Sequence, residues 1–188
     1  MIHSEAEDAR VTELALAARS GDRASLEGFV RGTQRDVWRF LAHRAGVRLA
    51  DDLTQETYLR ALKSLRGFSG RSSARSWLLA IARRVVVDQI RHERARPRTA
   101  PGVDWERAAD RNARDSADFA DVVELNALLA DLDDDRREAL LLTQVLGLSY
   151  QEAAEICGCA IGTIRSRVAR ARAELIDGPG EGTRTSSA

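Results

Sequence analysis

Residues 147–172 read GLSYQEAAEICGCAIGTIRSRVARAR, and this stretch decides the fold of the C-terminal part of the chain. Ser149 and Glu152 have the spacing of a capping box, in which each side chain bonds the other residue's backbone at the start of a helix. Gly158 suits the left-handed conformation that ends a short helix. A longer helical pattern follows over about residues 161–176. Two helices joined by so tight a turn predict a helix-turn-helix motif.

The second helix of this motif combines an apolar face with a cationic one. Three- and four-residue spacings predict its buried face, formed by Ile161, Ile164, Val168, Ala171 and Leu175. From the opposite face we predict the DNA-contacting residues Thr163, Arg165, Ser166, Arg167 and Arg170. Small residues permit close approach to a major groove, Ser, Thr and Arg can read base edges, and flanking arginines can hold phosphates. A solvated helix of a bundle is the alternative, but it leaves the absence of acids from 162 to 173 unexplained.

The distribution of charge divides the chain, although the net charge is zero. Residues 1–97 carry 18 Arg and Lys against 12 Asp and Glu, whereas residues 119–188 carry 7 against 12. The four arginines between 165 and 172 therefore form a basic stripe within an acidic domain. Their positions carry more weight than their number, because Lys63 is the one lysine among 29 basic residues and such a bias often reflects genome composition.

Helical periodicity continues through most of the chain and predicts an all-α protein. Outside the motif, helices are expected over about residues 9–20, 23–45, 50–65, 74–94, 120–131 and 136–146. The helix after the Gly- and Ser-rich loop 66–73 is apolar nearly all round, so we expect it at the centre of a bundle. Residues 98–118 lack periodicity, which is typical of a flexible linker, and a disordered tail is expected over 178–188.

Composition excludes several classes of protein. No stretch approaches the roughly 18–20 apolar residues of a membrane span, and the acidic N-terminus lacks the apolar segment of a signal peptide. We therefore expect a cytoplasmic protein without a membrane contact. Cys157 and Cys159 cannot supply four zinc ligands, and no histidine lies near them in the sequence. We interpret both as small buried hydrophobes without a redox role, and predict no metal and no cofactor.

Two separate motifs resemble those of one bacterial family. The segment ADDLTQETYLRA at 50–61, followed by Phe68, WLLAIAR at 77–83 and Asp88, resembles region 2 of extracytoplasmic-function sigma factors. The segments at 147–158 and 161–167 resemble region 4 of the same family. The likeness covers about residues 10–176 and implies two small helical domains joined by a flexible linker. These are a four-helix region 2 bundle at 1–97, the linker at 98–118 and a region 4 helix-turn-helix domain at 119–177.

The resemblance implies that the protein binds core RNA polymerase and directs promoter recognition, DNA melting and initiation. The residues that match the segment docking on the clamp helices of the polymerase β′ subunit are Asp51, Asp52, Gln55 and Glu56. Acids and an amide along an exposed helix suit a cationic partner helix. Region 4 is implied to bind the β flap and to read the −35 element, and an anti-sigma factor is a possible further partner.

The loop 66–73 and the helix after it match the part of region 2 that captures and melts the −10 element. The residues carried over for this role are Arg71, Ser72, Arg83, Arg84, Arg91, His92 and Arg94. Arg84 stands where the family usually has asparagine. We expect Trp77 to pack in the core rather than stack on a base, and Asp88 to orient Arg84 and Arg91 through ion pairs.

The sequence disfavours two alternatives to a sigma factor. A stand-alone helix-turn-helix repressor or activator would use residues 1–97 for ligand sensing or dimerisation, but that part has no evident ligand motif. An enzyme is disfavoured because the chain has no Gly-rich phosphate loop, metal-ligand cluster or nucleophile elbow.

Overall fold

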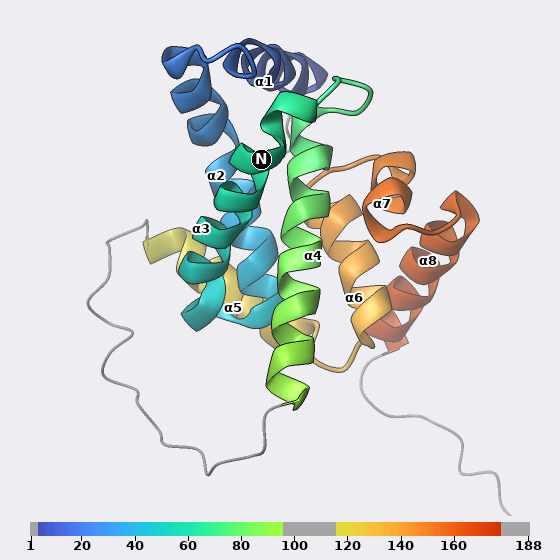
Figure 1. Cartoon of the computed structure of the whole chain (residues 1–188). Helices are drawn as coiled ribbons and strands as arrows, with labels where there is room; N and C mark the ends of the chain where they lie inside the picture. The colour runs from blue at the N-terminus through green and yellow to red at the C-terminus, as the bar shows by residue number, and fades with distance from the viewer. Residues whose placement is uncertain (1–3, 96–115, 178–188) are drawn as a thin grey trace, which may run out of the picture.

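The computed structural model describes residues 4–95 and 116–177, and every regular element in these two ranges is a helix (Figure 1). The N-terminal part contains α1 (Glu5–Ala18), α2 (Arg23–Ala45), α3 (Val47–Ser64) and α4 (Ala74–Ala95), with a 3-10 turn at Leu65–Gly67. The C-terminal part contains α5 (Ser116–Leu128), α6 (Asp134–Leu140), a π turn at Leu141–Val145, α7 (Tyr150–Cys157) and α8 (Ile161–Asp177). The expectation of an all-α fold is confirmed.

Local sequence explains most helix ends. The Asp133 carboxylate accepts a hydrogen bond from the Arg136 backbone N at 2.9 Å and so caps α6. Gly46 ends α2 with a φ of 84°, as its position predicts. The expected start of α3 at residue 50 is wrong, because the helix resumes directly after Gly46 at Val47.

The predicted boundary between linker and C-terminal domain needs correction. Helix α5 begins at Ser116, so the last three residues of the predicted linker 98–118 are helical, and it ends at Leu128 rather than at 131. The rest of that linker and the tail predicted at 178–188 lie outside the described residues.

Helix α4 lies at the centre of the molecule, as its all-round apolar surface predicts. It packs against α1, α2 and α3 on one side and against α7 on the other (Figure 1). Ile81 and Leu79 are both buried although they lie about 160° apart around the helix, and Leu78 and Val86 between them are fully buried. Trp77 belongs to this core, since its ring centroid lies 4.9 Å from that of Phe68. The preference for core packing over base stacking at Trp77 is confirmed.

The two halves of the chain pack against each other through two hydrophobic clusters. The smaller one joins α5 to α2 and α3. The larger one contains Leu78 from α4 and Leu142 from the π turn, both fully buried. Polar contacts reinforce it, because the buried Arg75 side chain donates to both the Asp36 carboxylate and the Leu146 carbonyl. The two predicted helical domains therefore also contact each other directly within the described residues.

Within residues 4–95 and 116–177, no helix combines the length and apolar character needed to cross a membrane. The same two ranges contain no group of three or more His, Cys, Asp or Glu side chains arranged to hold a metal ion.

Candidate nucleic-acid interface

The predicted helix-turn-helix is formed by α7 and α8. The Ser149 hydroxyl accepts a hydrogen bond from the Glu152 backbone N at 3.2 Å, and the Glu152 carboxylate accepts one from the Ser149 backbone N at 3.0 Å. The capping box is thus confirmed. Gly158 has a φ of 67° and ends α7 in the left-handed conformation. These two ends fix the short helix and the angle at which the chain enters α8.

Helix α8 presents the two faces that its sequence predicts, with one exception. Ile164, Val168 and Ala171 are buried between α8 and the neighbouring helices α6 and α7. Leu175, expected on the same face, is 41% exposed. Ile176 is exposed beside it.

The predicted DNA ligands on α8 differ in how free they are. Arg165 and Arg170 are exposed, and neither makes a hydrogen bond or an ion pair within the described part of the chain. Ser166 is exposed but its hydroxyl donates to the Thr163 carbonyl at 2.9 Å, while Thr163 itself is half-buried. Arg167 is held by the Asp135 carboxylate. Two free arginines therefore flank a hydroxylic tip.

The predicted −10 residues are only partly brought together. Arg71 is exposed on the loop, where its Nε donates to Ser69 Oγ at 3.3 Å, and Ser72 next to it is half-buried. Arg84, Arg91 and His92 are exposed along α4. Arg94 lies on the same helix, but its side chain lies outside the described residues.

Arg83 departs from this group because it faces the C-terminal half. Its Nε donates to Glu138 Oε2 of α6 at 3.0 Å. Glu138 is 1% exposed, and its other oxygen lies 3.6 Å from the Arg44 Nε of α2. Burial opposes the charge on Arg83, but the Glu138 carboxylate outweighs it and raises the pKa of Arg83. A buried acid thus joins α2, α4 and α6, and sequence reasoning missed it because Glu138 precedes an apolar run.

A second contact joins the loop before α4 to α7. The Glu152 carboxylate accepts hydrogen bonds from the Ser76 hydroxyl at 2.7 Å and from the Ser73 hydroxyl at 3.1 Å. Burial disfavours ionisation of Glu152, but these bonds and those from Ser149 prevail and lower its pKa below the ordinary value. The end of the predicted −10 loop is therefore engaged by the helix-turn-helix.

The predicted polymerase-docking residues share one stretch of α3. Asp52 and Gln55 are exposed, and Glu56 is half-exposed. Asp51 accepts a hydrogen bond from Trp38 Nε1 at 3.0 Å, so it also secures α3 to α2. The stretch continues into two exposed leucines, Leu59 (55%) and Leu62 (42%).

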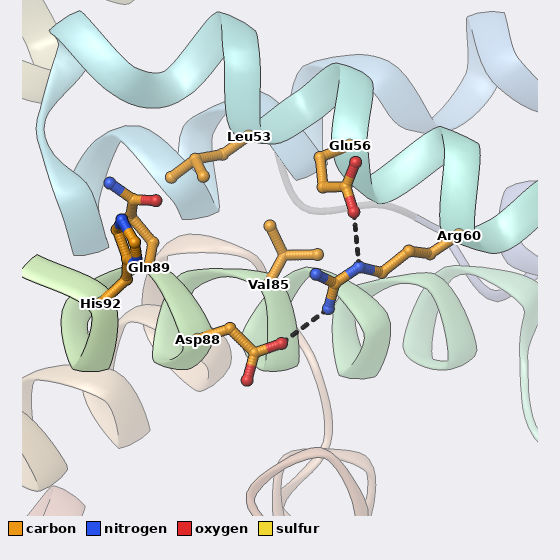
Figure 2. Close-up of a pocket in the computed structure, with 7 residues that line it drawn as sticks. All are labelled: Leu53, Glu56, Arg60, Val85, Asp88, Gln89 and His92. Atoms are coloured by element: carbon orange, nitrogen blue, oxygen red, sulfur yellow. Dashed lines mark hydrogen bonds and ion pairs between the residues drawn. The ribbon is translucent and has the colours of Figure 1, made fainter.

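A shallow groove of about 290 Å³ lies between α3 and α4. Figure 2 shows its lining, which consists of Leu53, Glu56, Arg60, Val85, Asp88, Gln89 and His92. Arg60 forms ion pairs with Glu56 and Asp88, each at 2.7 Å. The expected pairing of Asp88 with Arg84 and Arg91 is therefore wrong, because a guanidinium from the neighbouring helix takes the carboxylate.

Comparisons with known proteins match both halves. Residues 29–96 match Sigma-70 region 2, and residues 123–175 match Sigma-70, region 4. The chain is 56% identical over 176 residues to ECF RNA polymerase sigma factor SigC of Mycobacterium tuberculosis, covering 94% of this chain and 95% of that one. It is 41% identical over 126 residues to ECF RNA polymerase sigma factor EcfG of Rhodopseudomonas palustris, covering 67% and 68% of the two chains.

Two solved structures have a similar fold. The first is CnrH in complex with the cytosolic domain of CnrY, with a TM-score of 0.65 and 25% identity over 89% of this chain and 96% of that one. The second is the sigma factor RpoE in complex with the anti-sigma factor NepR from Bartonella quintana, with a TM-score of 0.61 and 29% identity over 81% and 94%.

Proposed function

Because this chain belongs to the extracytoplasmic-function family of RNA polymerase sigma factors, we propose how its surfaces divide the work of promoter-specific initiation. The observation that carries the function is that region 2 and region 4 occur together, in the family's order, on one chain. The protein is a transcription initiation factor. It contributes binding surfaces and no catalysis of its own, acts in the cytoplasm, and leaves the chemistry of RNA synthesis to the polymerase.

Helix α8 is the proposed reader of the −35 element. Support comes from its exposed Arg165 and Arg170, which are free to reach DNA, and from the hydroxylic tip at Thr163 and Ser166. Arg167 joins them after exchanging Asp135 for a phosphate. A guanidinium can bond a guanine edge with two hydrogen bonds or hold a backbone phosphate, so both arginines suit a major groove.

Helix α3 is the proposed polymerase-docking element. Its exposed Asp52 and Gln55 and its half-exposed Glu56 offer negative and amide groups to a cationic helix of the β′ subunit. Asp51 secures the helix to α2 through its hydrogen bond with Trp38. Leu59 continues this face with an exposed apolar side chain, which fits the usual interface of an apolar centre with a polar rim.

The loop 66–73 and the C-terminal turns of α4 are the proposed −10 surface. Arg71, Arg84, Arg91 and His92 are exposed and can track the backbone of a separated strand. Arg83 and the end of the loop are bound to the C-terminal half, so their use requires the two halves to separate on the polymerase. An anti-sigma factor is a further proposed partner, by analogy with RpoE, whose structure is a complex with one.

The decisive experiment combines purified core RNA polymerase with this protein on a pool of genomic fragments from the source organism. We expect transcripts with defined start sites that depend on the protein. Arg170→Ala should reduce initiation about tenfold, in keeping with the loss of one specific DNA contact, whereas the exposed Arg31→Ala on α2 serves as the matched control.

Reversal of charge at Asp52 and Glu56 should abolish retention of core polymerase, and the same reversal at the exposed Glu5 and Glu13 should not. A protein that binds its own DNA site without polymerase and yields no start site would instead be a stand-alone repressor or activator, which would refute the proposal.

A further inference from the structure

The groove between α3 and α4 contains a charge bridge that the division of work above does not use. Arg60 of α3 donates from Nε to Glu56 Oε1, on its own helix, and from Nη1 to Asp88 Oδ2 of α4, each at 2.7 Å (Figure 2). One guanidinium thus connects the proposed polymerase-docking helix with the proposed DNA-binding helix.

This bridge is poorly suited to stabilising the fold. The side chains of Arg60, Glu56 and Asp88 are 39%, 44% and 54% exposed. Solvent screens ion pairs at such exposure, and their contribution to stability is small. The two helices already pack through the apolar floor of the groove, Leu53 and Val85. The main effect of the bridge is therefore on the charge of the side chains around it rather than on the stability of the fold.

Asp88 is an acid in the middle of the basic face of α4. Arg84 and His92 lie one helical turn before and after it, and Arg91 lies three residues on, so all four side chains share one side of the helix. Within residues 4–95 and 116–177, neither Arg84 nor Arg91 forms an ion pair. The Asp88 carboxylate pairs with Arg60 of α3, so it does not pair with Arg84 or Arg91, and both guanidinium groups remain exposed to solvent.

We propose that Arg60 is a positioning residue, which neutralises Asp88 and turns it toward α3 so that the basic face of α4 can hold the nontemplate strand. An unpaired carboxylate at position 88 would repel phosphates and compete with them for Arg84 and Arg91. The inference rests on the proposed −10 role of α4. Glu56 accepts a hydrogen bond from the Nε of the Arg60 guanidinium. If polymerase binds Glu56, Arg60 keeps Asp88 as its one remaining partner among the described residues.

The test measures binding of the holoenzyme to a promoter fragment recovered in the initiation assay, as a function of salt. Arg60→Gln should weaken binding about five- to tenfold, because one negative charge is exposed beside the strand. It should also make the dependence of log K on log salt shallower, by about one in the magnitude of the slope. Asp88→Asn should bind as well as the wild type or more tightly. The double variant should return to within about twofold of the wild type. Arg31→Gln, which removes one exposed charge from α2, is the matched control.

The opposite signs of the two single variants distinguish this role from a structural one. If Arg60→Gln and Asp88→Asn weaken binding equally, the pair only supports the fold and the inference is wrong. If the double variant stays as weak as Arg60→Gln, Arg60 contacts DNA itself, and the inference is again wrong. If wild-type holoenzyme initiates nowhere, the proposed function fails, and this inference fails with it.

Discussion

Glu138→Gln should separate the two halves of the molecule while leaving each half folded. Glu138 is 1% exposed and lies between Arg83 of α4, which is 27% exposed, and Arg44 of α2, which is 7% exposed. Glutamine keeps the shape and one hydrogen-bond acceptor but removes the charge. Arg83 is then left without its anion, and within the described residues Arg44 keeps only the Asp134 carboxylate, 3.6 Å from its Nη1, as an ion-pair partner.

The magnitude follows from the burial of these groups. Removing one member of a buried ion pair costs about 3–5 kcal/mol, and the lower end applies because Arg83 can still reach water. The cost falls on the packed arrangement, since both arginines are solvated when the halves separate. A shift of about 3 kcal/mol changes the ratio of packed to separated molecules roughly a hundredfold.

Small-angle X-ray scattering and hydrogen exchange can measure this shift. We expect Glu138→Gln to enlarge the radius of gyration and to speed exchange at the α4 amides that face α7, with unchanged helix content by circular dichroism. Glu124→Gln, an exposed acid on α5, is the matched control. A variant with the dimensions and exchange rates of the wild type would show that Glu138 does not hold the halves together.

Three further predictions concern single groups. Burial lowers the pKa of His43 below its ordinary value of 6.5, so the unfolded chain takes up the proton first as the pH falls. The Tm should therefore fall as the pH drops below about 6.5. If thermal melts show the same slope of Tm against pH for His43→Gln as for the wild type, this prediction is wrong. Burial raises the pKa of the Cys157 thiol to about 12, so alkylation at pH 8, followed by mass spectrometry, should be about a thousandfold slower than for a free thiol. Gly158→Ala should cost about 1–2 kcal/mol in denaturant unfolding, because the position has a φ of 67°, whereas Gly162→Ala, in regular helix with open space around it, should not destabilise the fold.

Sequence alone predicted the features that depend on neighbouring residues. The capping box at Ser149, the left-handed stop at Gly158 and the central position of α4 all follow from spacings within one element, and the structure has each of them. Helix ends without such a signal were predicted less accurately. Ser116 starts α5 inside the predicted linker because nothing in that stretch breaks a helix between Ser116 and Phe119.

Contacts between helices could not be predicted, because the spacing of charged residues along one helix does not reveal their partners on another helix. Asp88 has arginines at helical spacing on its own helix, yet it pairs with Arg60 of α3. Arg83 stands next to Arg84 in the sequence, but a step of about 100° around the helix turns it toward Glu138. The sequence therefore identified the basic end of α4 but not which of its arginines are free.

The packing of the two halves also suggests an order for the steps of initiation. The proposed docking face at Asp52 and Gln55 is exposed while the halves are packed, so polymerase is expected to bind this arrangement directly. The end of the proposed −10 loop is not equally available, because Ser73 at its end and Ser76 in the first turn of α4 are both bonded to Glu152. DNA that needs the loop must displace Glu152, whereas polymerase need displace nothing at Asp52 or Gln55. Core polymerase should therefore bind before promoter DNA, and the free protein should bind promoter fragments far more weakly than the holoenzyme does.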